Sequence, residues 1–197
     1  VSLQVGVHVR LMQIFGRKDK CLRKVKEIRR FSVKSFSKYV TEQKASDVLK
    51  NWRFEDARLY AEKMIKAFGQ PDEVAETTLS WNSIEPPFDR VWIVDESIPH
   101  DFPAPHRDYV YSSMKMKIPN DMLETLGHAS GSIIYDGLKM EVTARCGSLY
   151  ANAATLGFVK DLVDGVIKVN KEQAKKEYAA RIKSKPLPDW YPNTLGE

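Results

Sequence analysis

The sequence contains only two cysteines, Cys21 and Cys146, and no long apolar run. Two cysteines cannot form the disulfide framework of a small secreted domain. No apolar stretch approaches the roughly 18 residues that a membrane-spanning helix needs, and the N-terminus lacks the pattern of a signal peptide. We therefore expect a soluble, reduced, intracellular protein that does not enter a membrane.

The sequence also lacks the short motifs that identify many common enzymes. It has no glycine-rich phosphate loop, no Gly-x-Gly-x-x-Gly dinucleotide fingerprint, no Gly-x-Ser-x-Gly nucleophile elbow and no Cys-x-x-Cys pair. These absences make an enzyme less expected without excluding one. They also lead us to expect no cofactor.

Positive charge is concentrated at one end of the chain. Residues 1–32 hold nine of the 31 lysines and arginines but only two acids, whereas the remaining residues hold 22 bases and 24 acids. A basic arm of this density can bind nucleic acid or an anionic surface. The plain alternative is a solvated extension without a partner.

Apolar spacing predicts three main helices. A helix over residues 51–68 is indicated by apolar side chains three and four apart, and Gly69 is its stop signal. A second helix is predicted over residues 148–165. A third begins at Asn170, which resembles a capping box together with Gln173.

Strands are predicted between these helices. Residues 76–81, 90–95 and 109–118 have the composition or alternation of strands, and a short helix is predicted at 119–127. The segment 99–108 contains three prolines, so we expect a rigid loop there.

The strongest local signal is a hairpin over residues 132–142. Asp136-Gly137 lies between two β-rich runs, which predicts a two-residue turn with Gly137 at positive φ. The order of elements lacks regular strand–helix alternation and favours an α+β domain, mainly an antiparallel sheet with helices packed on it. We expect this domain at 33–183, after the basic extension at 1–32 and before an extended Pro-rich tail at 184–197.

The first candidate site is the predicted loop at 99–108. It contains His100 and His106, half of the chain's histidines, beside Asp101 and Asp108. Imidazole and carboxylate groups bind zinc, manganese or iron, and either histidine could act as a general base. Two histidines at this spacing form no established ligand motif, so we predict no metal ion. The alternative is a surface loop whose histidines contact only backbone.

The second candidate site is the strand–helix junction at 145–148. The free N–H groups of a helix start attract an anion and lower the pKa of a nearby cysteine, here Cys146. Arg145 and the N-cap candidate Ser148 are therefore candidate ligand-binding residues. The alternatives are a buried core cysteine and a salt bridge from Arg145 to a protein acid such as Glu141.

Several segments resemble an uncharacterised family of small proteins from contractile-tailed marine cyanophages. Many of those proteins begin Met-Lys-Ser-Phe, and Val33-Lys34-Ser35-Phe36 is similar. The resemblance covers about residues 33–183 and is carried by residues 33–43, 69–73, 100–111, 130–134 and 144–146. It implies a phage or host-infection context and supplies no catalytic residues. It also implies that residues 1–32 lie outside the native protein, with Val33 read from an alternative start codon.

Three functions remain open. The leading hypothesis is a non-enzymatic phage accessory or virion-associated protein that acts through protein contacts, in the cytoplasm of an infected host or in the virion. The second is a small enzyme that holds an anionic substrate at Arg145 and Ser148, with His100, His106 or Cys146 as catalytic candidates. The third is a nucleic-acid-binding protein that uses residues 10–30.

Overall fold

The computed structural model describes residues 44–197 except 83, 85–87, 185–187, 190 and 192–193. These residues belong to one compact unit, Lys44–Glu197. The predicted basic extension at 1–32, its nucleic-acid-binding residues 10–30 and Cys21 lie outside the described residues. No helix among the described residues is long and apolar enough to cross a membrane.

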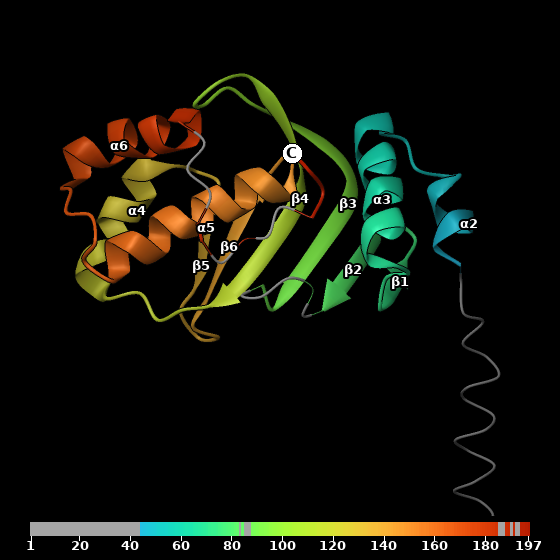
Figure 1. Ribbon diagram of the computed structural model, residues 1–197, viewed down its shortest axis with the longest axis horizontal. Helices are drawn as coiled ribbons and strands as arrows, with labels where there is room; N and C mark the ends of the chain where they lie inside the picture. Colours follow the sequence, from blue (N-terminus) through green and yellow to red (C-terminus); the bar gives the residue numbers. More distant parts are fainter. Residues whose placement is uncertain (1–43, 83, 85–87, 185–187, 190, 192–193) are drawn as a thin grey trace, which may run out of the picture. The chain divides into compact units, whose positions relative to one another are not determined.

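The centre of the fold is a six-stranded sheet in which every neighbouring pair is antiparallel (Figure 1). The strand order is β1-β2-β3-β4-β6-β5. The strands are β1 (Glu73–Ala75), β2 (Thr78–Asn82), β3 (Arg90–His100), β4 (His106–Lys115), β5 (Ile133–Asp136) and β6 (Glu141–Cys146). The predicted α+β class is confirmed.

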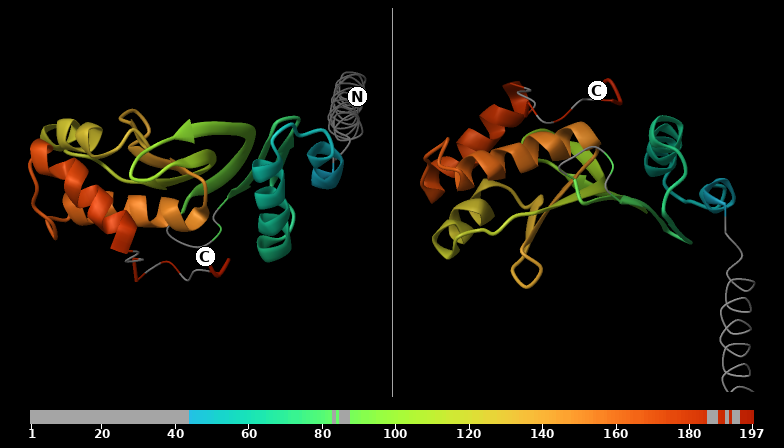
Figure 2. Two further views of the ribbon diagram at one scale, coloured as in Figure 1. Left: turned by 90° about the horizontal axis from the view of Figure 1, so that it is seen from above. Right: turned by 60° about the horizontal axis from the view of Figure 1, so that its bottom comes forward.

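The described residues form five helices, of which α3 and α5 pack on one face of this sheet. The five are α2 (Ala45–Leu49), α3 (Glu55–Phe68), α4 (Leu123–Ala129), α5 (Leu149–Val163) and α6 (Lys171–Ser184), with a 3-10 turn, η1 (Asn120–Met122). Helix α3 packs on β3, α5 packs on β4 and β6, and α6 packs on α4 and α5. Figure 2 shows α3 and α5 on the same side of the sheet. The Leu149 N–H at the start of α5 donates to the Tyr60 hydroxyl of α3.

The core lies between the sheet and these helices. It is built from side chains that are fully or almost fully buried, among them Leu79, Trp81, Ile93, Val110, Met64, Leu156 and Phe158. Helix α5 is buried on most sides, because it lies between the sheet and α6. Burial of this apolar surface is the main force that holds helices and sheet together.

The helix signals read from the sequence are confirmed. Ser148 caps α5, since its side chain accepts the Ala151 N–H at 3.1 Å. Asn170 and Gln173 form the reciprocal pair of a capping box at the start of α6. Gly69 ends α3 with φ +84°, a conformation that favours glycine.

The predicted hairpin exists, but its two-residue turn is wrong. Asp136 pairs with Glu141, so four residues form the connection, and Gly137 does not have positive φ. The Asp136 carboxylate accepts the N–H groups of Leu138 and Lys139, which closes the loop through a side chain. The left-handed position falls on Met140, with φ +49°.

The predicted loop at 99–108 is also wrong in most of its length. Strand β3 continues to His100 and β4 begins at His106, so only residues 101–105 connect them. An irregularity between Ile93 and Ile98 interrupts the register, and this hides the strand period in the sequence. Pro99 is tolerated because the backbone bonds of β3 with the β2 side end at Asp95, so no strand of the described residues needs an N–H from Pro99.

The two strands therefore extend beyond the sheet as a hairpin arm, residues 96–109. It forms the arch at the top of Figure 1 and reaches toward α6. Its tip contacts α6 through Phe102, whose ring stacks on Tyr178 at 6.0 Å and lies 4.8 Å from the Lys175 ammonium. The arm carries the four polar residues of the first candidate site, His100, Asp101, His106 and Asp108.

The described part of the tail packs on the domain. Pro188 lies against Gly157 of α5, and the Tyr191 ring contacts the Phe88 ring with centroids 6.2 Å apart. The Glu197 carboxylate accepts the Tyr150 N–H in the first turn of α5 and pairs with Lys63 at 2.8 Å. Several residues of the predicted extended tail lie outside the described residues.

Candidate functional site

The hairpin arm places the two histidines directly opposite each other. His100 pairs with His106 across the arm, and their ring centroids are 4.8 Å apart. Asp108 follows two residues after His106, and alternation along a strand puts their side chains on the same face. Strand register thus creates a cluster that loop residues would not form.

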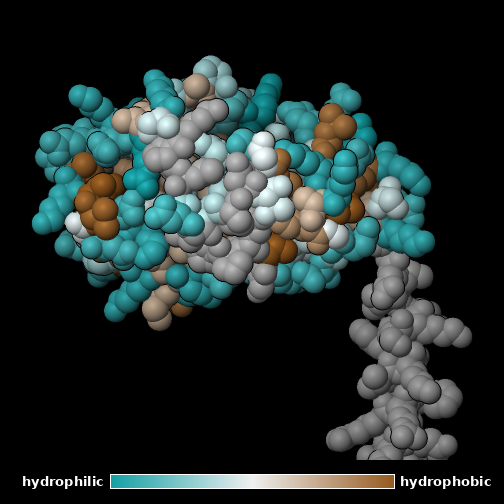
Figure 3. Space-filling model, in the orientation of Figure 1, coloured by the Kyte–Doolittle hydropathy of each residue, from teal (hydrophilic) through white to brown (hydrophobic). Residues whose placement is uncertain are grey.

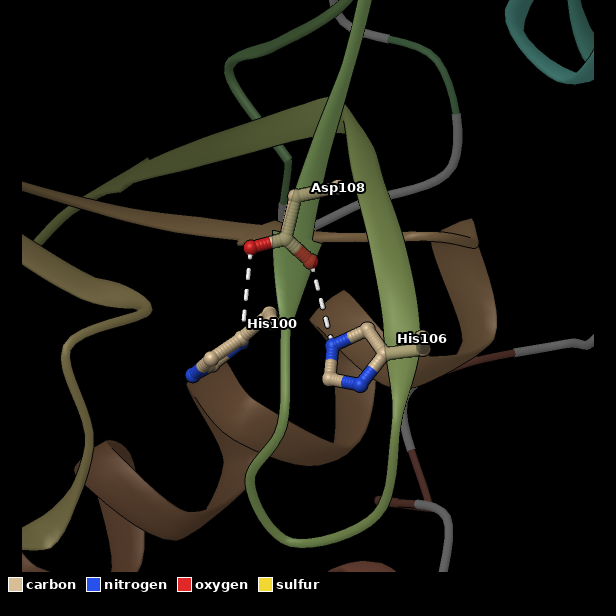
Figure 4. A group of neighbouring side chains, drawn as sticks. All are labelled: His100, His106 and Asp108. Atoms are coloured by element: carbon tan, nitrogen blue, oxygen red, sulfur yellow. Dashed lines mark ion pairs between the residues drawn. The ribbon is translucent and has the colours of Figure 1, made fainter.

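Asp108 is the centre of this cluster. Its side chain is fully buried, and its two oxygens face the two imidazole rings (Figure 4). Oδ1 lies 3.1 Å from His106 Nε2, and Oδ2 lies 3.4 Å from His100 Nδ1. A buried carboxylate is costly unless it is paired, and Oδ1 has no hydrogen-bond donor among the described residues.

Arg145 completes the charge balance at Asp108. Its Nε lies 3.2 Å from Asp108 Oδ2. The expected alternative of a salt bridge to a protein acid is therefore present, although the suggested partner Glu141 is wrong. Glu141 instead pairs with Lys115 at 2.9 Å.

Cys146 approaches the same cluster from β6. Its Sγ lies 3.3 Å from His106 Nε2, although the two residues are 40 positions apart. Burial raises the pKa of the thiol to about 12, and N–H groups of Gly147 and Ser148 offset only part of this effect. The expected lowering of this pKa by the helix start is wrong, because desolvation is the larger effect.

The start of α5 already has partners from the chain itself. Its first N–H groups donate to the Tyr60 hydroxyl, the Glu197 carboxylate and the Ser148 hydroxyl. A negative charge does lie at this helix end, as its dipole favours, but a protein carboxylate supplies it. Ser148 is engaged as a cap, and its role toward a ligand stays a prediction.

A cavity of about 480 Å³ adjoins the cluster. One part of its wall is apolar and consists of Pro103, Ala104, Pro105, Ala151 and Ile182. The other part is polar and includes His106, Arg107, Tyr109, Cys146, Ser148, Thr155, Tyr178 and Asp56. His106 and Cys146 therefore connect the buried cluster to a space large enough for a small organic molecule.

Gly147 lets β6 pass close to the arm at this point. A Cβ at this position would lie 2.6 Å from the Arg107 carbonyl oxygen. Glycine is therefore required by the close approach of two backbones. The contact fixes Cys146 next to the strand that carries His106 and Asp108.

The structure unites His100, His106, Arg145 and Cys146 around Asp108, while Ser148 lies farther along the cavity wall. The sequence did not single out Asp108 as their centre. The spacing His106-x-Asp108 was the available signal, but it becomes informative only when the segment is read as a strand. Asp101, the other acid of the segment, is exposed at the arm's tip.

A comparison of the chain with known proteins finds no match among family models, curated proteins or solved structures. The fold and the site therefore define the chain as an α+β protein with a buried histidine–carboxylate cluster beside a cavity.

Proposed function

We propose that the protein is a small enzyme whose substrate binds in the cavity beside His106 and Cys146. The observation that carries this proposal is the convergence of these two side chains, 40 residues apart, on the wall of a cavity of about 480 Å³. They are backed by the fully buried carboxylate of Asp108. A concave, partly apolar space with a few convergent reactive groups is the usual form of an active site.

The wall composition indicates the substrate class. The prolines of the arm's tip, Ala151 and Ile182 offer an apolar surface for the body of a small organic molecule. The polar end offers an imidazole, a thiol and hydroxyl groups for its reacting group. Arg145 contacts Asp108 and does not line the cavity. We therefore assign it to the charge balance of the cluster, and an anionic group on the substrate is no longer required.

Blocking the cavity tests this proposal without knowledge of the substrate. Ala151 on α5 lines the cavity, so Ala151→Trp should fill it, whereas Ala180→Trp on the exposed side of α6 is a matched control. We expect small carboxylates, amines, esters and phosphates screened by ligand-observed NMR to include binders. Their affinity should fall at least about tenfold in Ala151→Trp and remain in Ala180→Trp. Absence of binders, or equal binding to both variants, would overturn the proposal.

Turnover is the second measurement. Hits from the binding screen should be incubated with the native chain and with His106→Ala, and products followed by mass spectrometry. Loss of turnover in His106→Ala with retained folding supports catalysis at the cluster. Binding without turnover of any hit would favour a binding protein over an enzyme.

The other two functions read from the sequence stay predictions. Exposed apolar side chains on the face drawn in Figure 3 form separate areas on a mainly hydrophilic surface. Large exposed apolar residues within the described part of the chain are scattered over several elements: Leu59, Leu123, Ile134, Leu138, Met140 and Val166. No observation favours a protein-contact role in a phage over the cavity, and residues 10–30 lie outside the described residues.

A further inference from the structure

We propose that His100, His106 and Asp108 bind a divalent transition-metal ion of the zinc class, with Cys146 as its fourth donor. This adds a cofactor to the enzyme proposed above, but metal binding at the cluster does not require a substrate. It departs from the expectation drawn from the sequence, where two histidines alone formed no ligand motif. The folded chain adds a carboxylate and a thiol to them.

The first argument is the direction of the hydrogen bonds at His106. Its Nδ1 lies 2.7 Å from the Ala104 carbonyl oxygen, which can only accept, so the ring hydrogen belongs on Nδ1. The neutral ring then presents the lone pair of Nε2 to Asp108 Oδ1 at 3.1 Å. Two acceptors face each other, and a positive species has to lie between them.

The second argument is the state of Asp108 Oδ1. This oxygen is buried and has no hydrogen-bond donor among the described residues. The other oxygen, Oδ2, is held by Arg145 at 3.2 Å. The carboxylate is therefore fixed on one side and unsatisfied on the side that faces the histidines. Ligand carboxylates in metal sites are commonly oriented in this way.

The third argument is the spacing of the donor atoms. Zinc–nitrogen and zinc–oxygen bonds of about 2.0–2.1 Å place tetrahedral ligand atoms about 3.3 Å apart. The separations of His106 Nε2 from Asp108 Oδ1 and from Cys146 Sγ are 3.1 and 3.3 Å. Donor atoms of His100, His106 and Asp108 all lie within 4.8 Å of one another. Cys146 Sγ does not belong to this group, so the four donors are spread wider than a closed tetrahedron and have to move inward when an ion binds.

The donor types select the class of ion. Calcium and magnesium prefer six or more oxygen ligands, which this cluster cannot supply. Two imidazoles, one carboxylate and one thiol suit zinc, cobalt or ferrous iron. The hydrogen bond from His106 Nδ1 to a backbone carbonyl is a common support for a metal-binding imidazole. Because His106 and Cys146 line the cavity, the ion would lie at its polar end.

Cobalt binding to the full chain tests the inference. The chain is stripped with a chelator and titrated with Co²⁺, and visible absorption and bound metal per chain are measured. We expect one ion per chain, displaced by Zn²⁺, with affinity at least about tenfold lower in His100→Ala and in His106→Ala. His128→Ala, which removes an exposed histidine outside the cluster, should bind as the native chain does.

Cys146→Ser provides an independent readout. It should retain an ion but lose the near-ultraviolet absorption that a thiolate ligand gives to bound cobalt. Circular dichroism of each variant confirms that a loss of binding is not a loss of fold. Retention of the band in Cys146→Ser would remove Cys146 from the ligand set.

Absence of stoichiometric cobalt binding, or binding unchanged in both histidine variants, would overturn the metal site. The positive species between His106 and Asp108 would then be a proton on the ring. The outcome is distinguishable from failure of the proposed function, because fragment binding to the cavity and its loss in Ala151→Trp are measured separately. If the chain binds cobalt but no fragment binds in the cavity, the metal site is supported and the proposed enzyme function is overturned.

Discussion

Gly147 lies where the end of β6 passes the backbone of the hairpin arm. A methyl group there would meet the Arg107 carbonyl oxygen at 2.6 Å, and backbone cannot move aside as a flexible side chain can. We expect Gly147→Ala to lower the free energy of unfolding by about 2 kcal/mol. Gly131→Ala is the control, since a Cβ there meets nothing within 4 Å. Equal urea midpoints for the two variants would contradict this account.

Asp95 acts on a helix to which it does not belong. From β3 its carboxylate accepts the N–H groups of Arg53 and Phe54, at distances of 2.9–3.0 Å, at the start of α3. Phe54, at the N-cap position, has no capping side chain of its own. Asp95 therefore replaces the usual local cap and ties α3 to the sheet.

Removal of this carboxylate should cost more than the removal of a surface acid. We expect Asp95→Ala to destabilise the domain by about 1–2 kcal/mol, because two partly buried N–H groups at the start of α3 lose their acceptor. Glu62→Ala on the same helix removes an exposed acid paired with Arg58 and should change stability by less than about 0.5 kcal/mol. Thermal or urea unfolding measures both, and a smaller effect of Asp95→Ala would argue against capping across elements.

At the scale of elements, the β5–β6 loop carries its strain at Met140. A side chain at φ +49° is disfavoured, and this one is half exposed. We expect Met140→Gly to raise the free energy of unfolding by about 0.5–1 kcal/mol. Leu138→Gly, in the same loop without positive φ, should give no gain, because glycine there only increases the freedom of the unfolded chain. Urea unfolding compares the two variants.

The same loop changes the expectation for Gly137. The sequence predicted a turn that requires glycine, so that a β-branched residue would destabilise it. In the fold, a Cβ at Gly137 meets only the Tyr135 ring at 3.6 Å, an ordinary contact. We therefore expect Gly137→Ala to change stability by less than about 0.5 kcal/mol, and a loss above 1 kcal/mol in urea unfolding would restore the earlier interpretation.

At the scale of the whole molecule, Pro188 of the tail packs against α5 at Gly157, where the helix has no side chain. A Cβ at Gly157 would lie 2.4 Å from Pro188 Cγ, so the tail fits only against glycine. We expect Gly157→Ala to displace Pro188 and to accelerate amide exchange at Asp189, Tyr191 and residues 194–197 by about tenfold or more. Gly127→Ala in α4 is the control, since a Cβ there has open space. Hydrogen-exchange mass spectrometry measures both.

Much of the fold could be predicted because its signals are local. The cap at Ser148, the capping box at Asn170 and the stop at Gly69 each depend on a few neighbouring residues. The hairpin at 133–146 was predicted for the same reason, although its loop was not. Local residues indicate that the chain turns here. The conformation of the turn depends on the hydrogen bond from the Leu138 N–H to the Asp136 carboxylate and on the positive φ of Met140.

The candidate site was predicted only in parts, because it depends on register between distant residues. His100, His106, Arg145 and Cys146 were singled out separately, but nothing local shows that β4 and β6 bring them together. Prolines made the arm resemble a loop, and this concealed Asp108 as a strand residue. The contact of Glu197 with α5 spans 47 residues and has no sequence signal at all.

The hairpin arm contributes to the site in two ways: its paired strands carry the polar cluster, and its tip forms part of the cavity wall. His100, His106 and Asp108 are placed by strand pairing. In the connection at 101–105, Phe102 packs on α6 and the Ala104 carbonyl orients the His106 ring, whereas Pro103 and Pro105 contribute to the cavity wall. Substitution of Pro103 or Pro105 would therefore reshape the cavity wall, while strand pairing keeps the polar cluster in register. Changes in the cavity wall could therefore alter which substrate binds, while the cluster of His100, His106 and Asp108 stays as it is.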